Sequence, residues 1–481
     1  MNFTDRAFFY YFVAVYFVWL LIRRREDWTI PFLLVASLVF YGNNHWSLLP
    51  LLIVFCLIDW IIARRMEISF RPKRWLILGI SFNLLILAYF KYTPMLVETF
   101  TSLFGGPPRN FDNWKIPYGI SFYSFTGIAY LVDVYRKTNP AMQSLARYSL
   151  SAAFFPHLVA GPILRPHEFL NDLNPGRMPR EPLAPREACF LVARGFFKKL
   201  VVADRIALAI DPFFAHVGDG TTAGVWSLPY IYLYAFQIYF DFSAYTDIAR
   251  GLALLFGYRW PENFNRPYLA TSVAEFWHRW HITLSRFLRD YLFIPLGGSR
   301  CGFWKTNRNL MITMLLGGLW HGANWSFMIW GGLHGSFLVL HRLWSRIPLR
   351  GKLQNLNGTA GVVWKLVCIL LTFHAICLAW CFFRLTGWQQ SVDCVRKVFD
   401  FDTSRGFVGN AYDPAVWWAL LVYLLLSLLG QKLTEIRAVG SGVFVPSWKR
   451  GMAWGFGLGW IMLAILLAPD ASTPNFIYFQ F

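Results

Sequence analysis

The fold of this chain is decided by the stretch from Leu310 to Leu340, LMITMLLGGLWHGANWSFMIWGGLHGSFLVL. It contains no Asp, Glu, Lys or Arg, and it is longer than the ~20 apolar residues that a membrane-spanning helix needs. His321 nevertheless lies within it, between Trp320 and Gly322. An ionisable ring is costly inside a bilayer and usually marks a functional site. Because a neutral imidazole can take up a proton and return it, we expect proton chemistry at His321.

The glycines around this histidine indicate what surrounds it. Gly317, Gly318 and Gly322 allow a close backbone approach or a helix break, which suits a ligand channel. A hydrogen-bonded core histidine is the alternative interpretation. The membrane setting and the expected break favour a functional role for His321 over that alternative.

The composition of the whole chain also indicates a membrane environment. Of its 481 residues, 56% are hydrophobic and only 15% are charged, whereas a soluble domain averages about 25% charged residues. The formal net charge of +19 includes short basic clusters at the ends of apolar segments, at 23–25, 64–65 and 71–74. Such clusters fit the positive-inside rule and contact with anionic headgroups. We therefore expect membrane lipids, and no nucleic acid, as partners.

Recurring apolar segments predict an all-α polytopic membrane protein with about ten to twelve membrane helices, some of them broken or re-entrant. The positive-inside rule places 23–25, 64–74 and 136–137 at the cytoplasmic face. We interpret the chain as one domain, with peripheral N-terminal helices over 1–115, a catalytic core over 116–345 and C-terminal helices over 346–481. The segments are Phe8–Ile22, Ile30–Tyr41, Trp46–Ala63, Trp75–Phe90, Tyr118–Val134, Tyr148–Ala160, Trp226–Phe240, Ile248–Phe256, Leu310–Leu340, Val362–Phe383, Ala415–Leu429 and Met452–Leu467.

The segment 261–308 differs from the rest because it is amphipathic and too polar to cross lipid unshielded. It predicts short helices that lie within or along the membrane and line a cavity. Its densest part, Glu275–Asp290, includes His278 and His281, which would share one face of a helix. An interfacial helix that meets headgroups explains this composition about as well. The His-Glu-x-x-His zinc signature is absent, and we predict no metal site.

Three further polar side chains within or beside the apolar segments receive structural interpretations. His334 lies in the same apolar run as the first histidine and is interpreted as a packing residue. Asp241 and Asp247 are expensive near lipid unless they are paired or reach water. We expect them to pair with arginines such as Arg279 or Arg289.

A series of motifs runs in order from residue 118 to the C-terminus. The motifs are Tyr118-Gly119-Ile120-Ser121-Phe122-Tyr123, Phe155-Pro156-His157-Leu158-Val159-Ala160-Gly161-Pro162-Ile163, Asp241-Phe242-Ser243-Ala244-Tyr245-Thr246-Asp247, Asn263-Phe264-Asn265-Arg266-Pro267-Tyr268, Phe276–Asp290 with Pro295-Leu296-Gly297-Gly298, Trp320-His321-Gly322 and Phe476-Ile477-Tyr478-Phe479-Gln480-Phe481. Together they resemble the membrane-bound O-acyltransferase (MBOAT) family. The resemblance is closest to its alginate O-acetylation branch, and more distant to the branch that transfers D-alanine to teichoic acid. It implies a ring of transmembrane helices around a thinned centre, where a cavity connects a cytoplasmic donor side to an outer acceptor side.

The resemblance implies that the proton chemistry is acyl transfer, with His321 catalytic and His281 a second functional histidine. It implies acetyl transfer from a cytoplasmic donor, acetyl-CoA, to hydroxyls of an exported alginate-like polysaccharide, directly or through an extracytoplasmic partner protein. We expect no bound cofactor, and a multi-pass location in the bacterial inner membrane. As roles, we expect His321 to be the general base on the acceptor hydroxyl, and His281 to orient a substrate or stabilise oxyanion charge.

We also expect substrate contacts from Asn324, Trp280, Ser285, Asp290 and Asn263. Asn324 follows His321 by one helical turn and could hydrogen-bond the substrate carbonyl or the ring. No cysteine lies in either histidine motif, so direct transfer in a ternary complex is simpler than an acyl-enzyme, although Ser285 is close to His281. Two alternatives are a non-enzymatic transporter of acyl donor or glycan, with the histidines as a proton relay, and a scaffold for a polysaccharide synthase.

Overall fold

The structure is a computed structural model that describes residues 2–107, 109–111, 113–159, 161–217 and 227–399, with 414, 416–418 and 420–421. Within these residues all regular elements are helical and no strand occurs, which confirms the all-α class. The expected segment 452–467, most of 415–429 and the closing motif 476–481 lie outside the described residues.

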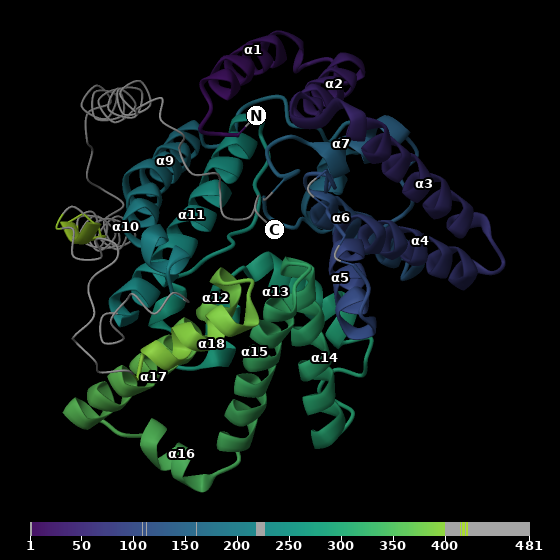
Figure 1. Cartoon of the computed structure of the whole chain (residues 1–481). Coiled ribbons are helices and arrows are strands. Elements are labelled where there is room, and N and C mark those ends of the chain that lie inside the picture. The colour runs from purple at the N-terminus through teal and green to yellow at the C-terminus, as the bar shows by residue number, and fades with distance from the viewer. Residues whose placement is uncertain are drawn as a thin grey trace. The chain divides into compact units, whose positions relative to one another are not determined.

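Most α-helices of the described chain are labelled in Figure 1. Three of them run on into single π-helical segments, η2 (Ala88–Tyr92), η4 (Phe197–Ala203) and η7 (Arg289–Phe293). The α-helices are α1 (Arg6–Ile22), α2 (Glu26–His45), α3 (Leu49–Ile68), α4 (Pro72–Leu87), α5 (Thr93–Phe104), α6 (Ile120–Tyr135), α7 (Leu145–Ala153), α8 (Pro166–Phe169), α9 (Pro185–Phe196), α10 (Asp204–Ala215), α11 (Ser227–Leu255), α12 (Val273–Arg279), α13 (Ile282–Leu288), α14 (Phe303–His321), α15 (Trp325–Trp344), α16 (Pro348–Gln354), α17 (Gly358–Arg384) and α18 (Trp388–Lys397).

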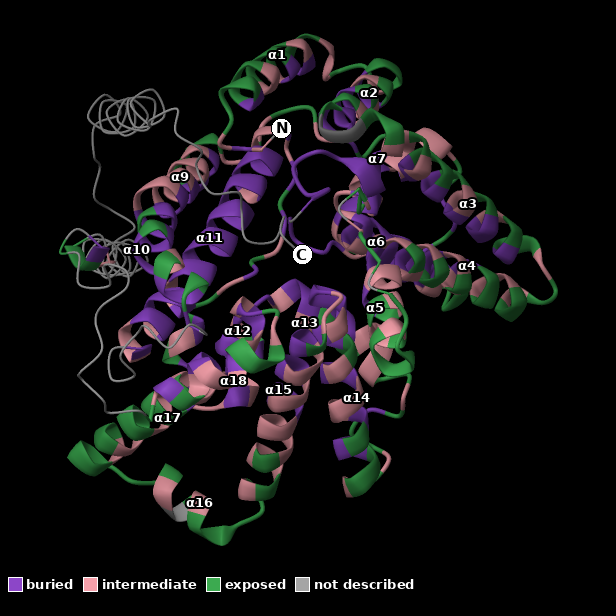
Figure 2. Cartoon of the chain, viewed as in Figure 1, coloured by how far each residue is buried: buried purple, intermediate pink, exposed green. Residues whose placement is uncertain are grey.

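Three helical runs of the described chain are long and apolar enough to cross a membrane, namely Trp46–Ile68, Pro72–Phe104 and Gly358–Arg384. Only 22–39% of the residues in their most apolar stretches are buried. Figure 2 shows exposed residues along α3, α4 and α17. Exposed large side chains such as Leu366 and Leu371 of α17 suit a surface that faces lipid. The membrane character is confirmed, while the total of ten to twelve membrane helices stays a prediction.

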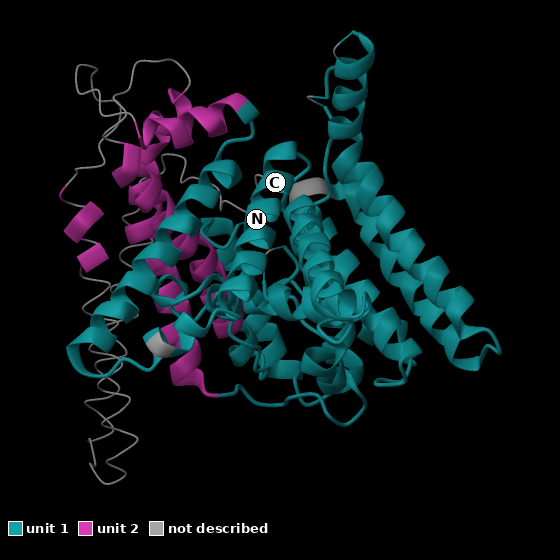
Figure 3. Ribbon diagram, turned by 90° about the horizontal axis from the view of Figure 1, so that it is seen from below, with its two compact units in different colours: residues 1–183, 252–388, 481 teal, residues 184–251, 389–480 magenta. Residues whose placement is uncertain are grey.

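The chain divides into two compact units, coloured in Figure 3. The first comprises residues 1–183 and 252–388 with 481, and it contains both histidine motifs. The second comprises 184–251 and 389–480, and it includes α9, α10, most of α11 and most of α18. The expected subdivision at residues 115 and 345 stays a prediction.

In the first unit, α14 and α15 form a closely packed hairpin. A Cβ atom on Gly318 would lie 2.2 Å from the carbonyl oxygen of Phe327, and one on Gly331 would lie 2.3 Å from that of Met314. Small residues at such an interface allow two helix backbones to approach closely. The expected helix break is present, because α14 ends at His321 and α15 begins only at Trp325.

The segment 261–308 forms short helices, as predicted, but His278 and His281 do not share a helical face. The helix α12 ends at Arg279, and α13 begins at Ile282, so the two histidines lie on either side of a break. His281 has a positive φ of 41°, a left-handed conformation that cannot continue a right-handed helix. His278 is exposed and His281 is buried, so the expectation of a common face is wrong.

Candidate active site

The fold brings His281 and His321 together from different helices. His281 precedes the first turn of α13, and His321 is the last residue of α14. Their ring centroids are 6.4 Å apart, and the ring planes are inclined by 57°. Both side chains are buried, with 0% and 4% of their surface exposed. The central segment therefore folds back onto the broken helix, as the pairing of the two motifs requires.

Asn263 holds His281 in place. The Nδ1 atom of His281 lies 3.1 Å from Oδ1 of Asn263, and the same oxygen accepts hydrogen bonds from the backbone N–H and the hydroxyl of Thr283. A carbonyl oxygen only accepts, so Nδ1 of the neutral ring carries the proton and Nε2 keeps its lone pair. This oxygen orients the ring of His281, and a substrate contact from Asn263 stays a prediction.

Burial also determines the charge of His281. The loss of solvation disfavours an imidazolium and lowers the pKa of His281 to about 3. The ring is therefore neutral at physiological pH. Its left-handed backbone adds local strain, which persists only where surrounding contacts enforce it and which is common at functional sites.

Aromatic side chains enclose the histidine pair. The ring of His321 contacts those of Trp330 and Phe383, with centroids 5.0 and 5.3 Å away, and its neighbour Trp320 stacks on Phe125 at 5.1 Å. Such walls exclude water, and a low dielectric strengthens every remaining polar interaction.

The other predicted contact residues lie at different distances from this pair. Trp280 is buried against Trp380, with centroids 5.0 Å apart. Ser285 lies one turn into α13, and its hydroxyl donates to the carbonyl oxygen of Trp280. Asn324 is not one helical turn from His321, because α14 has already ended. Its Oδ1 instead accepts from the backbone N–H of Ser326, at 2.9 Å, and caps α15.

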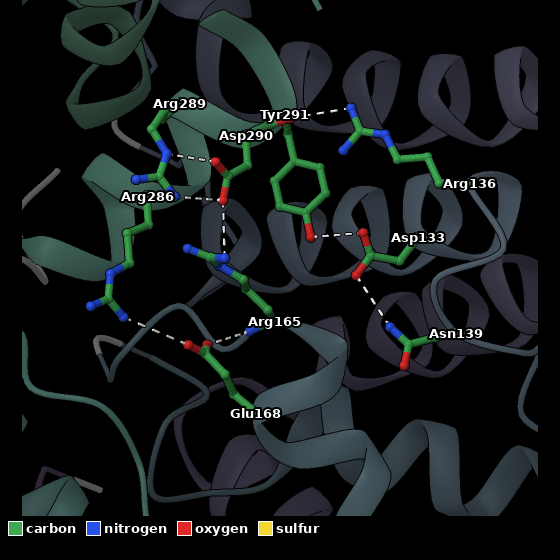
Figure 4. Close-up of polar contacts among 9 residues, drawn as sticks. All are labelled: Asp133, Arg136, Asn139, Arg165, Glu168, Arg286, Arg289, Asp290 and Tyr291. Carbon is green, nitrogen blue, oxygen red and sulfur yellow. Dashed lines mark hydrogen bonds and ion pairs between the residues drawn. The ribbon is translucent and has the colours of Figure 1, made fainter. Parts of the chain in front are cut away.

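Asp290 belongs to a separate polar cluster, shown in Figure 4. It lies beyond the far end of α13 from His281, which is about 10 Å of helix at 1.5 Å per residue. Its carboxylate pairs with Arg165 at 2.9 Å and with Arg289 at 2.6 Å. We name the set Arg136, Arg165, Arg286 and Arg289, with Asp133, Glu168 and Asp290, the arginine cluster.

The arginine cluster connects four helical elements. Arg286 approaches Glu168 at 3.9 Å, and Tyr291 donates to Asp133 at 3.0 Å, which ties α13 and η7 to α8 and α6. Four guanidinium groups face three carboxylates, so the cluster has an excess of positive charge. The side chains of Arg286 and Arg289 are 45% and 54% exposed.

In the second unit Asp241 and Asp247 are buried and paired, but not with the arginines expected. Asp247 contacts Arg194 at 2.6 Å and Lys198 at 2.7 Å, and Asp241 contacts Lys199 at 2.8 Å. Arg279 and Arg289 pair with Glu275 and Asp290 instead. The pairing itself was correctly anticipated; the partners were wrong because the contacts join helices distant in sequence.

His334 contributes to the packing that surrounds the histidine pair. It is buried, its Nδ1 accepts from the indole N–H of Trp277 at 3.2 Å, and its ring lies 4.6 Å from that of Trp330.

No role was predicted from the sequence for Lys91, whose ammonium group reaches the end of α14. The sequence signal for it was a lysine directly after the apolar segment Trp75–Phe90.

Comparisons with known proteins identify the family of this chain. The family model described as MBOAT, membrane-bound O-acyltransferase family, matches residues 134–385, a range that includes both histidines. The "Probable alginate O-acetylase AlgI" of Pseudomonas putida is 35% identical over 505 residues, covering 100% of each chain. The "Peptidoglycan O-acetyltransferase" of Helicobacter pylori is 35% identical over 397 residues, covering 76% of this chain and 72% of the relative.

A more distant relative is the "Teichoic acid D-alanyltransferase" of Bacillus subtilis, 27% identical over 293 residues, covering 58% of this chain and 70% of the relative. The chain belongs to the membrane-bound O-acyltransferase family. It is a membrane protein and an acyltransferase enzyme, which confirms the resemblance found in its sequence motifs.

Proposed function

We propose that this chain transfers acetyl groups from a cytoplasmic thioester donor to hydroxyls of an exported, alginate-like polysaccharide. The observation that carries the proposal is the pair of buried rings, His281 and His321, at 6.4 Å from each other. Support for acetyl as the transferred group and a polymer as the acceptor comes from the names of the alginate and peptidoglycan relatives.

In the proposed reaction, His321 is the general base. It takes the proton of the acceptor hydroxyl while that oxygen bonds to the thioester carbonyl carbon. The tetrahedral intermediate collapses, the carbon–sulfur bond breaks, and the leaving thiolate receives the proton from His321. The products are an acetyl ester and a free thiol, and the ring returns to its neutral form. Neither step requires a bound cofactor or an acyl-enzyme.

His281 then has an orienting role. In its neutral form Nδ1 donates to Asn263, and Nε2 accepts. An oxyanion needs donors, so a lone pair on Nε2 does not suit oxyanion stabilisation. The single proton of the reacting hydroxyl goes to His321, so Nε2 of His281 instead accepts from another hydroxyl of the acceptor and thereby orients it beside His321. Of the two roles expected for His281 from the sequence, the proposal keeps substrate orientation and drops oxyanion stabilisation.

We place the donor's phosphates at the arginine cluster. Exposed guanidinium groups recognise phosphate oxygens in bidentate fashion, and Arg286 and Arg289 lie on the same short stretch that His281 begins. The positive-inside rule assigns Arg136 to the cytoplasmic face. Along α6, Ser121 near the His321 motif and Asp133 in the cluster are separated by about 18 Å of helix rise, a distance that an extended pantetheine arm can cross.

The proposal includes the location of the enzyme and its partner. A multi-pass location in the bacterial inner membrane lets a cytoplasmic acetyl-CoA meet an acceptor on the outer side. The acetyl group passes to the polymer directly or through an extracytoplasmic partner protein. Because both rings are buried, substrates reach them by displacing some of the packed side chains around them.

The test is acetyl transfer from labelled acetyl-CoA in membrane vesicles that contain the chain and its polymer acceptor. His321→Ala should lower the rate at least about 100-fold, the contribution of one general base. The matched control is His374→Ala, since His374 is an exposed histidine on α17. If His321→Ala folds and keeps the full rate, the proposal is wrong. Movement of donor or glycan across proteoliposomes without ester formation would instead favour the transporter.

A further inference from the structure

The C-terminal end of α14 carries carbonyl oxygens that no residue of the helix itself can satisfy. The last carbonyl oxygens of any helix have no partner within the helix. Here those oxygens belong to Leu319, Trp320 and His321, and the next residue, Gly322, is fully extended with φ −159° and ψ 149°. Inside a bilayer, water cannot satisfy them, and each unsatisfied buried group costs several kcal/mol.

Two neighbouring side chains of η2 satisfy these oxygens. The hydroxyl of Tyr92 donates to the carbonyl of Leu319 at 3.0 Å. The ammonium of Lys91 donates to the carbonyls of Trp320 at 2.5 Å and His321 at 3.1 Å. We name Lys91 and Tyr92 the carbonyl clamp. Three consecutive carbonyls at the end of the catalytic helix are thus held by two consecutive residues of another element.

The π-helical form of η2 belongs to this arrangement. It interrupts an otherwise α-helical run from Pro72 to Phe104, and single π turns within α-helices are frequent at functional sites. The wider turn changes the direction in which successive side chains leave the helix. Both clamp residues therefore point toward the same helix end, as their hydrogen bonds require.

The buried charge of Lys91 is a costly way to satisfy carbonyl oxygens. Its side chain is almost completely buried, with 3% of the residue exposed, and burying an ammonium is costly unless its charge is compensated. Within the described chain, no carboxylate forms an ion pair with it. Its further contacts there are the hydroxyl of Ser121 at 3.4 Å and the face of Trp320 at 6.0 Å. The negative end of the α14 dipole supplies the compensation.

We propose that Lys91 and Tyr92 are positioning residues for acyl transfer, which hold the terminal carbonyls of α14 and thereby fix the ring of His321. This inference rests on the proposed function. At a helix end the carbonyl oxygen of His321 has no partner within the helix, so its backbone is held less firmly than that of residues farther back. Displacing a reacting group by about 1 Å can cost roughly 100-fold in rate, so a loose helix end would impair the base.

The experiment compares Lys91→Met, Lys91→Arg and Tyr92→Phe in full-length protein reconstituted in vesicles. Transfer from labelled acetyl-CoA gives kcat and the KM for acetyl-CoA, and a thermal melt reports folding. Lys305→Met and Tyr89→Phe are matched controls, because Lys305 and Tyr89 are exposed on the same two helical runs. We expect Lys91→Met to lower kcat about 100-fold and Tyr92→Phe about threefold to tenfold, with the KM changed less than twofold.

Rescue separates positioning from simple stability. Lys91→Arg keeps a cationic donor and should recover at least a tenth of the wild-type kcat. If Lys91→Met does not fold, Tyr92→Phe decides, since it removes one hydroxyl and preserves the ring. A lower melting temperature with unchanged kcat in the folded variants would overturn the inference. Full activity of His321→Ala would overturn the proposed function, whereas an inactive His321→Ala beside a fully active Lys91→Met would overturn the clamp alone.

Discussion

Replacing Asn263 by alanine tests the orientation of His281 most directly. The oxygen of Asn263 accepts from the ring of His281, at 3.1 Å, and from the backbone and hydroxyl of Thr283, at 3.1 and 3.0 Å. Alanine removes the acceptor and leaves the ring N–H and the backbone N–H of Thr283 buried without it. The hydroxyl of Thr283 can rotate toward another acceptor, so its loss matters less.

The expected loss of stability follows from the two donors that lose their acceptor, the ring N–H of His281 and the backbone N–H of Thr283. A buried donor that loses its partner costs about 2 kcal/mol, so Asn263→Ala should destabilise the protein by about 4 kcal/mol. The effect on chemistry is separate, because the ring is then free to change tautomer and orientation. We expect kcat to fall about 100-fold, the scale of a misplaced reacting group, with the donor KM unchanged. Asn263→Asp keeps the oxygen acceptors and should remain within about tenfold of the wild-type kcat.

The assay is transfer of labelled acetyl to polymer in vesicles, measured over a range of acetyl-CoA and acceptor concentrations. Thermal melting of the purified variants in detergent gives the stability term independently. A folded Asn263→Ala protein whose kcat stays within threefold of the wild type would refute the orienting role. A variant that raises only the acceptor KM would show that Asn263 binds substrate, as its motif first suggested.

Three further predictions concern stability. Since the pKa of folded His281 is about 3, the unfolded chain binds a proton below pH 6.5 that the folded chain does not, so stability should fall by about 2 kcal/mol from pH 6.5 to 5. His281→Gln should reduce the accompanying drop in Tm, and an unchanged drop would contradict this. Asp247→Ala leaves the charge of Lys198 without this carboxylate and should cost about 3–5 kcal/mol in thermal melts, whereas a loss below 1 kcal/mol would argue against a buried pair. Gly318→Val drives a Cβ against a carbonyl and should abolish folded protein on gel filtration, whereas Gly351→Ala, with nothing within 4 Å, should not.

Much of the architecture could be predicted because it depends on composition and local pattern. The scarcity of charge and the apolar runs identified a helical membrane protein, and the glycines around His321 predicted the break that separates α14 from α15. The expected short helices of the segment 261–308 are also present. Each of these features is encoded within a few turns of chain, where residue type and spacing suffice.

The details of the site could be predicted less well. Periodicity treated 275–290 as one helix, whereas the left-handed His281 divides it, and a tertiary hydrogen bond to Asn263 holds that residue. Asn324 was placed by helical spacing on a helix that ends before it. In both cases a local rule was overridden by contacts that the local pattern does not contain.

Residue composition and motif order were enough to predict a membrane environment, a helical class and two candidate histidines, since the cost of burying charge in lipid depends on residue type. The distance of 6.4 Å between the rings of His281 and His321, the Asn263 contact that selects the tautomer of His281, and the Lys91 contact at the end of α14 emerged only from the folded chain. Those contacts join segments far apart in the chain. The hydrogen bonds among them become strong only when packing has excluded water.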